Sequence, residues 1–168
     1  PNFRGILKRI HELSKDLKIP IIVKEVGSGI SPQVAVKLQK NNINAIGYDG
    51  NPSTEILTDN KCKVKDLTIN FSIKNKYSWI LCIELGEHIP KKFESKLIEN
   101  LDNNCTNGII LSWAVKGQGG HGHYNCQNND YIKNIFKKLN YTNDLVWEKK
   151  LRKSSSLPWF KNTLMVFR

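Results

Sequence analysis

Apolar residues recur along this chain with two different spacings, and the two spacings alternate. Residues 3–17 carry apolar side chains three or four positions apart, which predicts an opening amphipathic helix. Further on, short β-branched runs alternate with helical patterns, so we expect an α/β fold: a mainly parallel sheet with an antiparallel last strand and helices on both faces. The expected strands are 21–26, 44–49, 62–66, 78–83, 108–115 and 163–167, and the expected helices are 32–41, 91–101, 129–139 and 144–155.

The first candidate binding element is the run EVGSG at residues 25–29, which follows a β-branched run. Ser31 and Pro32 supply a helix N-cap and a helix-starting proline, so the expected order is strand, glycine turn, helix. Glycines let the backbone approach a ligand closely, and the next helix offers unpaired N–H groups. Asp49 ends the next strand, where a carboxylate can accept both ribose hydroxyls. The pattern predicts a nucleotide-cofactor cradle, with an ordinary βα turn as the alternative.

The spacing of these glycines separates two classes of cofactor. A dinucleotide fingerprint requires a third glycine where this chain has Pro32, which disfavours a dehydrogenase. An acidic residue two positions before the first glycine instead resembles the first motif of class I S-adenosylmethionine-dependent methyltransferases. That resemblance implies a Rossmann-like sheet that binds S-adenosyl-L-methionine. The cofactor-binding residues it implies are Glu25, Gly27, Ser28 and Gly29 for the methionine part, Asp49 and Gly50 for the ribose, Asp66 and Leu67 for the adenine, and Glu84 beyond strand 78–83.

A second polar group, Glu84, Glu87 and His88, comes directly after strand 78–83. Parallel sheets bind ligands at the carboxyl ends of their strands, so this group is expected where the glycine cradle also opens. Side chains three and four positions apart share a helical face. Two carboxylates and an imidazole held so close repel each other and lose hydration unless a cation lies among them. The group therefore predicts a divalent metal site, although His88 alone also suits a hydrogen-bonded histidine near a helix start.

A third element is GQGGHGHYNC at residues 117–126, which follows the fifth strand and carries His121 and His123. Four glycines and two histidines within ten residues predict a loop that approaches another group closely. Because the loop leaves the neighbouring strand end, we expect one of its histidines to complete the metal site. The spacing of the histidines and Cys126 fits no standard structural zinc site.

Together, these two polar segments resemble two groups of metal-dependent O-methyltransferases, those of the ubiquinone pathway and the small-RNA 3′-terminal 2′-O-methyltransferases. In the RNA enzymes, two glutamates and two histidines hold magnesium, which engages vicinal hydroxyls. The implied metal ligands here are Glu84, Glu87, His88 and either His121 or His123, with magnesium or manganese as the expected ion. The histidine that does not coordinate is expected to accept the hydroxyl proton, so both loop histidines are candidate catalytic residues. The loop and the closing LPWFKNTLMVF also resemble a smaller group of methyltransferase-like proteins, which implies no particular substrate.

Composition narrows the class of protein. The 168 residues carry a net charge of +11, from 26 basic and 15 acidic residues, but the lysines are scattered and arginine is scarce, which favours a solvated surface over a nucleic-acid patch. The four cysteines form no CxxC pair, which indicates free thiols. No apolar run is long enough to span a membrane and no signal-peptide pattern is present, so we expect a cytoplasmic protein without a membrane partner. The start at Pro1 suggests that residues 1–168 are a single methyltransferase-like domain excised from a longer chain, which would carry additional domains.

These elements predict an S-adenosylmethionine-dependent, metal-assisted O-methyltransferase that acts on a vicinal diol. The expected acceptor is a sugar or glycan, because no inserted cap covers the site and because Trp113 and Tyr124 are placed to stack on a sugar ring. Trp113 as a core residue is the alternative. An RNA ribose 2′-O-methyltransferase predicts binding that falls steeply with salt. A non-catalytic cofactor-binding module predicts cofactor binding without metal dependence.

Overall fold

The computed structural model describes residues 8, 12, 21–25, 33–40, 42–73 and 76–168. Within them, six strands form one sheet in the order β3-β2-β1-β4-β5-β6, in which only β6 is antiparallel to its neighbour. The mainly parallel sheet and its antiparallel last strand are therefore confirmed. The strand order reverses between β1 and β4, the position at which doubly wound sheets bind their ligands. The strands are β1 (Ile21–Glu25), β2 (Gly47–Asp49), β3 (Cys62–Val64), β4 (Tyr77–Ile83), β5 (Cys105–Leu111) and β6 (Met165–Phe167).

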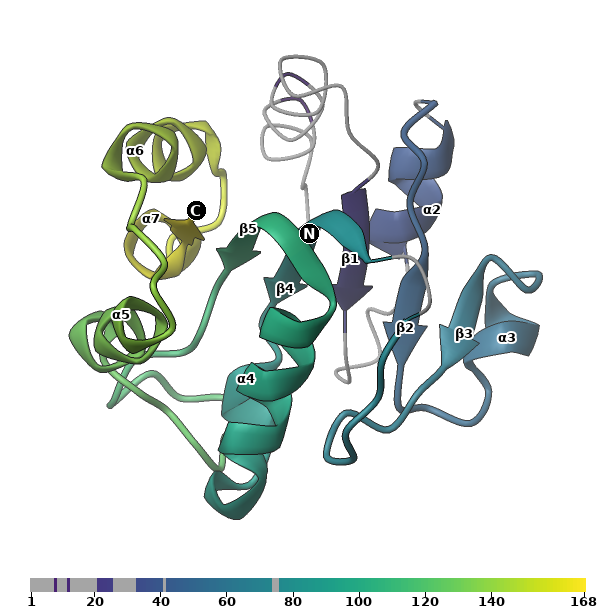
Figure 1. Ribbon diagram of the computed structural model, residues 1–168, viewed down its shortest axis with the longest axis horizontal. Helices are drawn as coiled ribbons and strands as arrows, with labels where there is room; N and C mark the ends of the chain where they lie inside the picture. The colour runs from purple at the N-terminus through teal and green to yellow at the C-terminus, as the bar shows by residue number, and fades with distance from the viewer. Residues whose placement is uncertain (1–7, 9–11, 13–20, 26–32, 41, 74–75) are drawn as a thin grey trace.

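Helices cover both faces of the sheet, as predicted. Successive side chains of a strand point to opposite faces, so Trp79 and Leu81 of β4 join one core while Ile80 and Cys82 join the other. Helices α2, α6 and α7 contribute to the first core, and α4 and α5 contribute to the second; Figure 1 shows α4 in front of the sheet. The helices are α2 (Gln33–Lys40), α3 (Thr54–Leu57), α4 (Glu94–Asn103), α5 (Asn129–Lys138), α6 (Leu145–Ser154) and α7 (Phe160–Thr163), with 3₁₀ turns η1 (Gly86–His88) and η2 (Lys91–Phe93).

Some boundaries differ from the predicted ones for identifiable reasons. The strand predicted at 108–115 ends at Leu111, where its pairing with β4 stops. Trp113 stays buried beyond the strand because its indole N–H donates to the Asn125 carbonyl at 2.6 Å. The helix predicted from residue 91 begins as the 3₁₀ turn η2, and α7 occupies the start of the predicted last strand.

The opening helix predicted for residues 3–17 lies outside the described residues, except that Lys8 and Glu12 are helical. Among the helices that the structure describes, none combines the length and the apolar character needed to cross a membrane.

Candidate active site

The carboxyl ends of β1, β4 and β5 lie side by side at one edge of the sheet. Glu25, the last residue of β1, is in register with Ile83, the last residue of β4, and Leu111 at the end of β5 is in register with Cys82. The segments that leave β4 and β5 therefore start from the same edge. They are the turn η1 and a loop of residues 115–126, which we call the histidine loop.

Glu84 is held against the end of β5. Its N–H donates to Ser112 Oγ and the Ser112 hydroxyl donates to Glu84 Oε1, both at 2.8 Å. The backbone φ of Glu84 is 50°, a left-handed conformation that is uncommon for a residue with a side chain. Burial raises the pKa of Glu84, while the Ser112 hydrogen bond and His123 oppose that rise. Ser112 has no distinctive sequence pattern that would identify it as a partner of this carboxylate.

Glu87 lies in η1 and its side chain is completely buried. Neither of its carboxylate oxygens has a hydrogen-bond partner among the described residues. Burial, followed by repulsion from Glu84, raises the pKa of Glu87 to about 8. The backbone amides of Glu87 and Ala114 approach the carboxylate without the geometry of a hydrogen bond, and they oppose this rise only in part. A buried carboxylate without a partner is uncommon in folded proteins, because the lost hydration must be replaced. Its environment therefore favours either a proton or a bound cation.

His88 and His123 each use one ring nitrogen to contact a backbone carbonyl of the histidine loop. His88 Nδ1 lies 3.0 Å from the Gly122 oxygen, and His123 Nδ1 lies 3.2 Å from the Gln118 oxygen. A carbonyl oxygen only accepts, so Nδ1 carries the hydrogen in each ring. In the neutral imidazole Nε2 then presents a lone pair, which is the arrangement that backbone carbonyls impose on metal-binding histidines. Burial lowers the pKa of His88 and so favours this neutral form.

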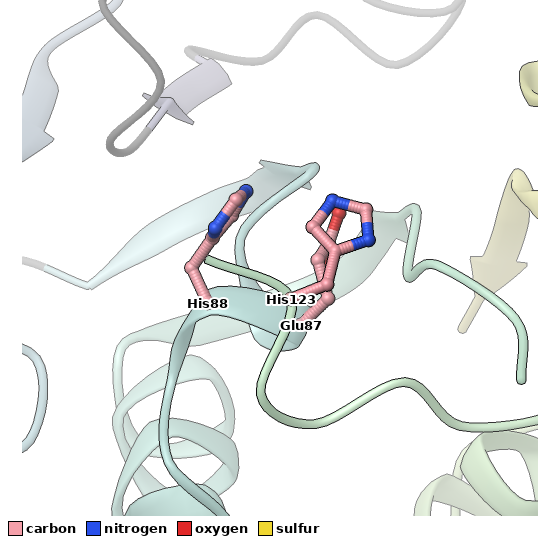
Figure 2. Close-up of side chains that lie close together, drawn as sticks. All are labelled: Glu87, His88 and His123. Atoms are coloured by element: carbon pink, nitrogen blue, oxygen red, sulfur yellow. The ribbon is translucent and has the colours of Figure 1, made fainter. Parts of the chain in front are cut away.

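Glu87, His88 and His123 come together as a group that we call the triad (Figure 2). One ligand atom from each side chain lies within 4.8 Å of the other two. A carboxylate and two imidazole nitrogens form a donor set suited to a divalent transition metal or manganese. Glu84 and His121 are both described but lie outside this group, and His121 is exposed. Their assignment as metal ligands stays a prediction, as does the catalytic role of either loop histidine.

A glycine of the loop explains how the His123 ring fits. A side chain at Gly120 would place its Cβ 2.2 Å from His123 Nε2, so the imidazole packs directly on the backbone there. The close approach predicted from the glycine-rich composition therefore involves, at this position, the loop's own histidine.

The residues predicted to hold the cofactor are placed in part. Asp49 is buried at the end of β2, and its Oδ1 accepts the Asn51 N–H at 2.7 Å, whereas Gly50 beside it is exposed. Asp66 is exposed and its Oδ1 accepts from the N–H and hydroxyl of Thr68, while Leu67 is buried. The backbone of Glu25 ends β1. The other cradle residues, Gly27, Ser28 and Gly29, lie outside the described residues, so these cofactor roles stay predictions.

Comparison of the sequence with curated proteins gives matches to a short segment. No family model matches the chain. Isopentenyl-diphosphate delta-isomerase from Chlorobaculum parvum is 45% identical over 49 residues, and the isomerase of the same name from Thermococcus kodakarensis is 46% identical over 48 residues. Each match covers 29% of this chain and spans 14% or 13% of the isomerase. Matches of that extent leave most of the chain without a counterpart.

Comparison with solved structures covers almost the whole chain. The methyltransferase domain of bacterial CtHen1 aligns over 98% of this chain and 96% of its own, with a TM-score of 0.61 and 12% identity. Magnesium protoporphyrin IX methyltransferase from Synechocystis PCC 6803, with bound S-adenosylhomocysteine, aligns over 97% and 82%, with a TM-score of 0.63 and 14% identity. Small RNA methyltransferase HEN1 aligns over 96% of this chain and 24% of its own, with a TM-score of 0.64 and 13% identity. The chain therefore has the Rossmann-like fold of class I S-adenosylmethionine-dependent methyltransferases.

Proposed function

We propose that this chain is an S-adenosylmethionine-dependent O-methyltransferase whose acceptor hydroxyl is bound through a divalent cation held by the triad. The observation that carries the proposal is the buried Glu87 carboxylate, which has no hydrogen-bond partner among the described residues. It lies beside two imidazoles whose Nδ1 atoms contact backbone carbonyls, so that their Nε2 atoms point away from those carbonyls. The fold supports the proposal, as does the position of Glu87 and His88 beyond β4, the strand that pairs with β1. Glu84 is retained as a proposed further ligand, and its Oε1 accepts from the Ser112 hydroxyl.

The cofactor would occupy the cradle formed beyond β1, β2 and β3. Glu25, Gly27, Ser28 and Gly29 are proposed to face the methionine part of S-adenosylmethionine. Asp49 and Gly50 are proposed to hold the ribose, because a buried carboxylate that accepts one N–H keeps capacity for further donors. Asp66 and Leu67 are proposed to meet the adenine.

The chemistry follows from this arrangement. A bound divalent cation lowers the pKa of a coordinated hydroxyl and orients it. The hydroxyl oxygen then forms a bond to the methyl carbon while the carbon–sulfur bond of the sulfonium breaks, and S-adenosylhomocysteine leaves. The proton passes to His121, which is exposed on the same loop as His123 and is free of the triad. Imidazole suits this role because it titrates near neutral pH.

The proposed acceptor is a vicinal diol of a sugar or glycan, since two adjacent oxygens chelate one cation. Trp113 is buried with its indole N–H bonded to the Asn125 carbonyl, so it is a core residue and does not stack on substrate. Tyr124, which is 74% exposed and follows His123, is the remaining aromatic platform.

An RNA ribose 2′-OH is the second candidate acceptor, because small RNA methyltransferase HEN1 shares the fold of this chain. A polyanionic substrate would make binding weaken linearly with the logarithm of salt concentration, whereas a neutral glycan would not. Methyl transfer to oligosaccharides and to RNA, each measured at two salt concentrations, separates the two acceptors.

The test of the proposed function is calorimetric titration of the whole chain with S-adenosylhomocysteine and with Mn²⁺. Wild type is expected to bind both. Glu87→Gln and His123→Ala are expected to bind S-adenosylhomocysteine normally and Mn²⁺ at least about tenfold more weakly, which is the scale on which metal sites respond to lost support. His121→Ala is the matched control, because it removes an imidazole of the same loop that lies outside the triad. It should keep Mn²⁺ binding and lose methyl transfer. Wild-type binding of S-adenosylhomocysteine without any response to Mn²⁺ would refute the metal-assisted mechanism and favour the non-catalytic module.

A further inference from the structure

Asn125, at the end of the histidine loop, uses every polar group that it has. Its N–H donates to the Glu87 carbonyl at 3.0 Å, and its own carbonyl accepts the Trp113 indole N–H at 2.6 Å. Its side-chain Nδ2 donates to Glu94 Oε2 at 2.8 Å, and its Oδ1 accepts from Gln127 Nε2 at 2.6 Å. Asn125 is buried, and its bonds to Trp113 and Glu94 are made away from competing water. One residue thus ties the histidine loop to the turn that carries Glu87 and His88.

Glu94, the partner of the Asn125 side chain, is itself fixed at the start of α4. Its Oε1 accepts from Lys91 Nζ at 2.7 Å and from the Tyr131 hydroxyl at 2.5 Å. These bonds, together with the one from Asn125, lower the pKa of Glu94 despite its burial, so it stays a charged acceptor. Because Tyr131 belongs to α5, the carboxylate joins α4, α5 and the loop.

The two ends of the histidine loop also meet at this point. The Gln127 N–H donates to the Ala114 carbonyl at 2.9 Å, which closes the loop where it leaves and rejoins the fold. His123 lies two residues before Asn125 and faces His88 with ring centroids 5.0 Å apart. A change in the position of Asn125 would therefore move His123 relative to Glu87 and His88.

We infer that the Asn125–Glu94 pair positions His123 in the proposed metal site, so that Asn125 is a positioning residue and not a ligand. The inference rests on the proposed function for its metal. In the metal-free chain, the same pair determines whether His123 Nδ1 reaches the Gln118 carbonyl.

The test exchanges the donor and acceptor of the pair. Asn125→Asp places a carboxylate against Glu94 and is expected to weaken Mn²⁺ binding about tenfold or more. Glu94→Gln combined with Asn125→Asp restores one hydrogen bond, since the glutamine amide donates to the new aspartate while its oxygen still accepts from Lys91 and Tyr131. The double variant is expected to recover most of the wild-type Mn²⁺ affinity.

The matched control is Asn143→Asp, which alters another asparagine–glutamate pair. Asn143 Nδ2 donates at 2.8 Å to Glu148, a buried residue of α6. This variant is expected to lower the melting temperature while Mn²⁺ affinity stays unchanged. If Asn125 has a purely structural role, Asn125→Asp should likewise lower the melting temperature without changing Mn²⁺ affinity. That result would overturn the inference.

A second readout works without metal. Nitrogen-15 chemical shifts of the histidine rings report which nitrogen carries the hydrogen. In metal-free protein, His123 is expected to lose its Nδ1–H form in Asn125→Asp and to regain it in the double variant. If wild type fails to bind Mn²⁺ but the ring shifts follow this pattern, the metal proposal fails and the positioning inference stands. Unchanged ring shifts in Asn125→Asp would overturn the inference.

Discussion

The imidazole rings of His88 and His123 meet edge to face, with centroids 5.0 Å apart and planes inclined at 81°. The two residues come from different segments, one from η1 and the other from the histidine loop, yet both donate Nδ1–H to carbonyls of that same loop. The loop therefore sets which nitrogen each ring presents, in addition to carrying one of the rings. Figure 2 shows the Glu87 side chain beside His123.

Adding a methyl group at Gly120 is predicted to displace His123. The new Cβ would lie 2.2 Å from His123 Nε2, which is too close for any contact, so the imidazole must move. Gly120→Ala should weaken Mn²⁺ binding about tenfold or more in a calorimetric titration. Gly119→Ala is the control, because a Cβ there meets nothing within 4 Å. Equal Mn²⁺ affinity in the two variants would mean that His123 is not a ligand.

The stability of the metal-free protein is predicted to fall as pH rises through the range in which Glu87 ionises. The folded-state pKa of Glu87 is raised from 4.5 to about 8. The folded state therefore holds this proton more tightly than the unfolded state, and the stabilisation is complete below pH 4.5 and is lost as pH approaches 8. Urea unfolding with a chelator should show a loss on the order of a few kcal/mol between pH 5 and 8.5.

Glu87→Gln isolates the contribution of this carboxyl group, because glutamine has nearly the same shape and does not ionise. The difference in unfolding free energy between wild type and this variant should change with pH over the same range. Saturating Mn²⁺ should remove the loss in wild type at pH 8.5, since a bound cation replaces the proton. A pH-independent difference between the two proteins would contradict the raised pKa.

Asn100 is predicted to hold the segment that carries Leu67. Its Nδ2 donates to the carbonyls of Leu67 and Ile69, and its Oδ1 accepts the Phe71 N–H, each at 3.0 Å. Asn100→Ala leaves these backbone groups unpaired, so we expect a loss of about 1–3 kcal/mol in unfolding free energy and weaker S-adenosylhomocysteine binding. Asn70→Ala removes only an exposed bond to Glu99 and should change neither quantity. Unchanged S-adenosylhomocysteine affinity in Asn100→Ala would show that this segment does not form the adenine site.

Asp49 is predicted to bind the ribose of the cofactor. Asp49→Asn preserves an oxygen for the Asn51 N–H but removes the charge, so S-adenosylhomocysteine affinity should fall about tenfold or more, the scale of a hydrogen bond to a charged group. Removing the ribose 2′-hydroxyl from the ligand should reduce affinity less in Asp49→Asn than in wild type. Asp59→Asn serves as the control, because the Asp59 side chain is 88% exposed. If Asp49→Asn weakens the binding of S-adenosylhomocysteine and of the analogue without the 2′-hydroxyl equally, the ribose does not contact Asp49.

The sheet could be predicted from the sequence because its strands read as short apolar runs between helical patterns, and β4, β5 and β6 at its centre and one edge are mostly buried. The same reasoning placed Glu87 and His88 beyond the end of β4, which the structure bears out. Which of His121 and His123 lies beside Glu87 and His88 could not be predicted. His123 contacts the Gln118 carbonyl and packs on Gly120, and neither contact has a sequence pattern.

Glu84 illustrates a second limit of the sequence. The spacing of Glu84, Glu87 and His88 suggested one shared face, but the left-handed backbone at Glu84 breaks the helical periodicity on which that expectation rested. Ser112 then binds the Glu84 carboxylate from the neighbouring strand end. Contacts of this kind, between segments far apart along the chain, follow only from the folded backbone.

The pairing of β1 with β4 carries a consequence for reaction geometry. Glu25 lies opposite Ile83, the last strand residue before the segment that bears Glu87 and His88. A slip of one residue between these strands would shift one relative to the other by about 3.3 Å. That length is comparable to the whole gap of about 3–3.5 Å across which reacting atoms must be aligned. In an enzyme of the proposed kind, the hydrogen-bond register at the centre of the sheet thus sets the distance between the methyl donor and its acceptor.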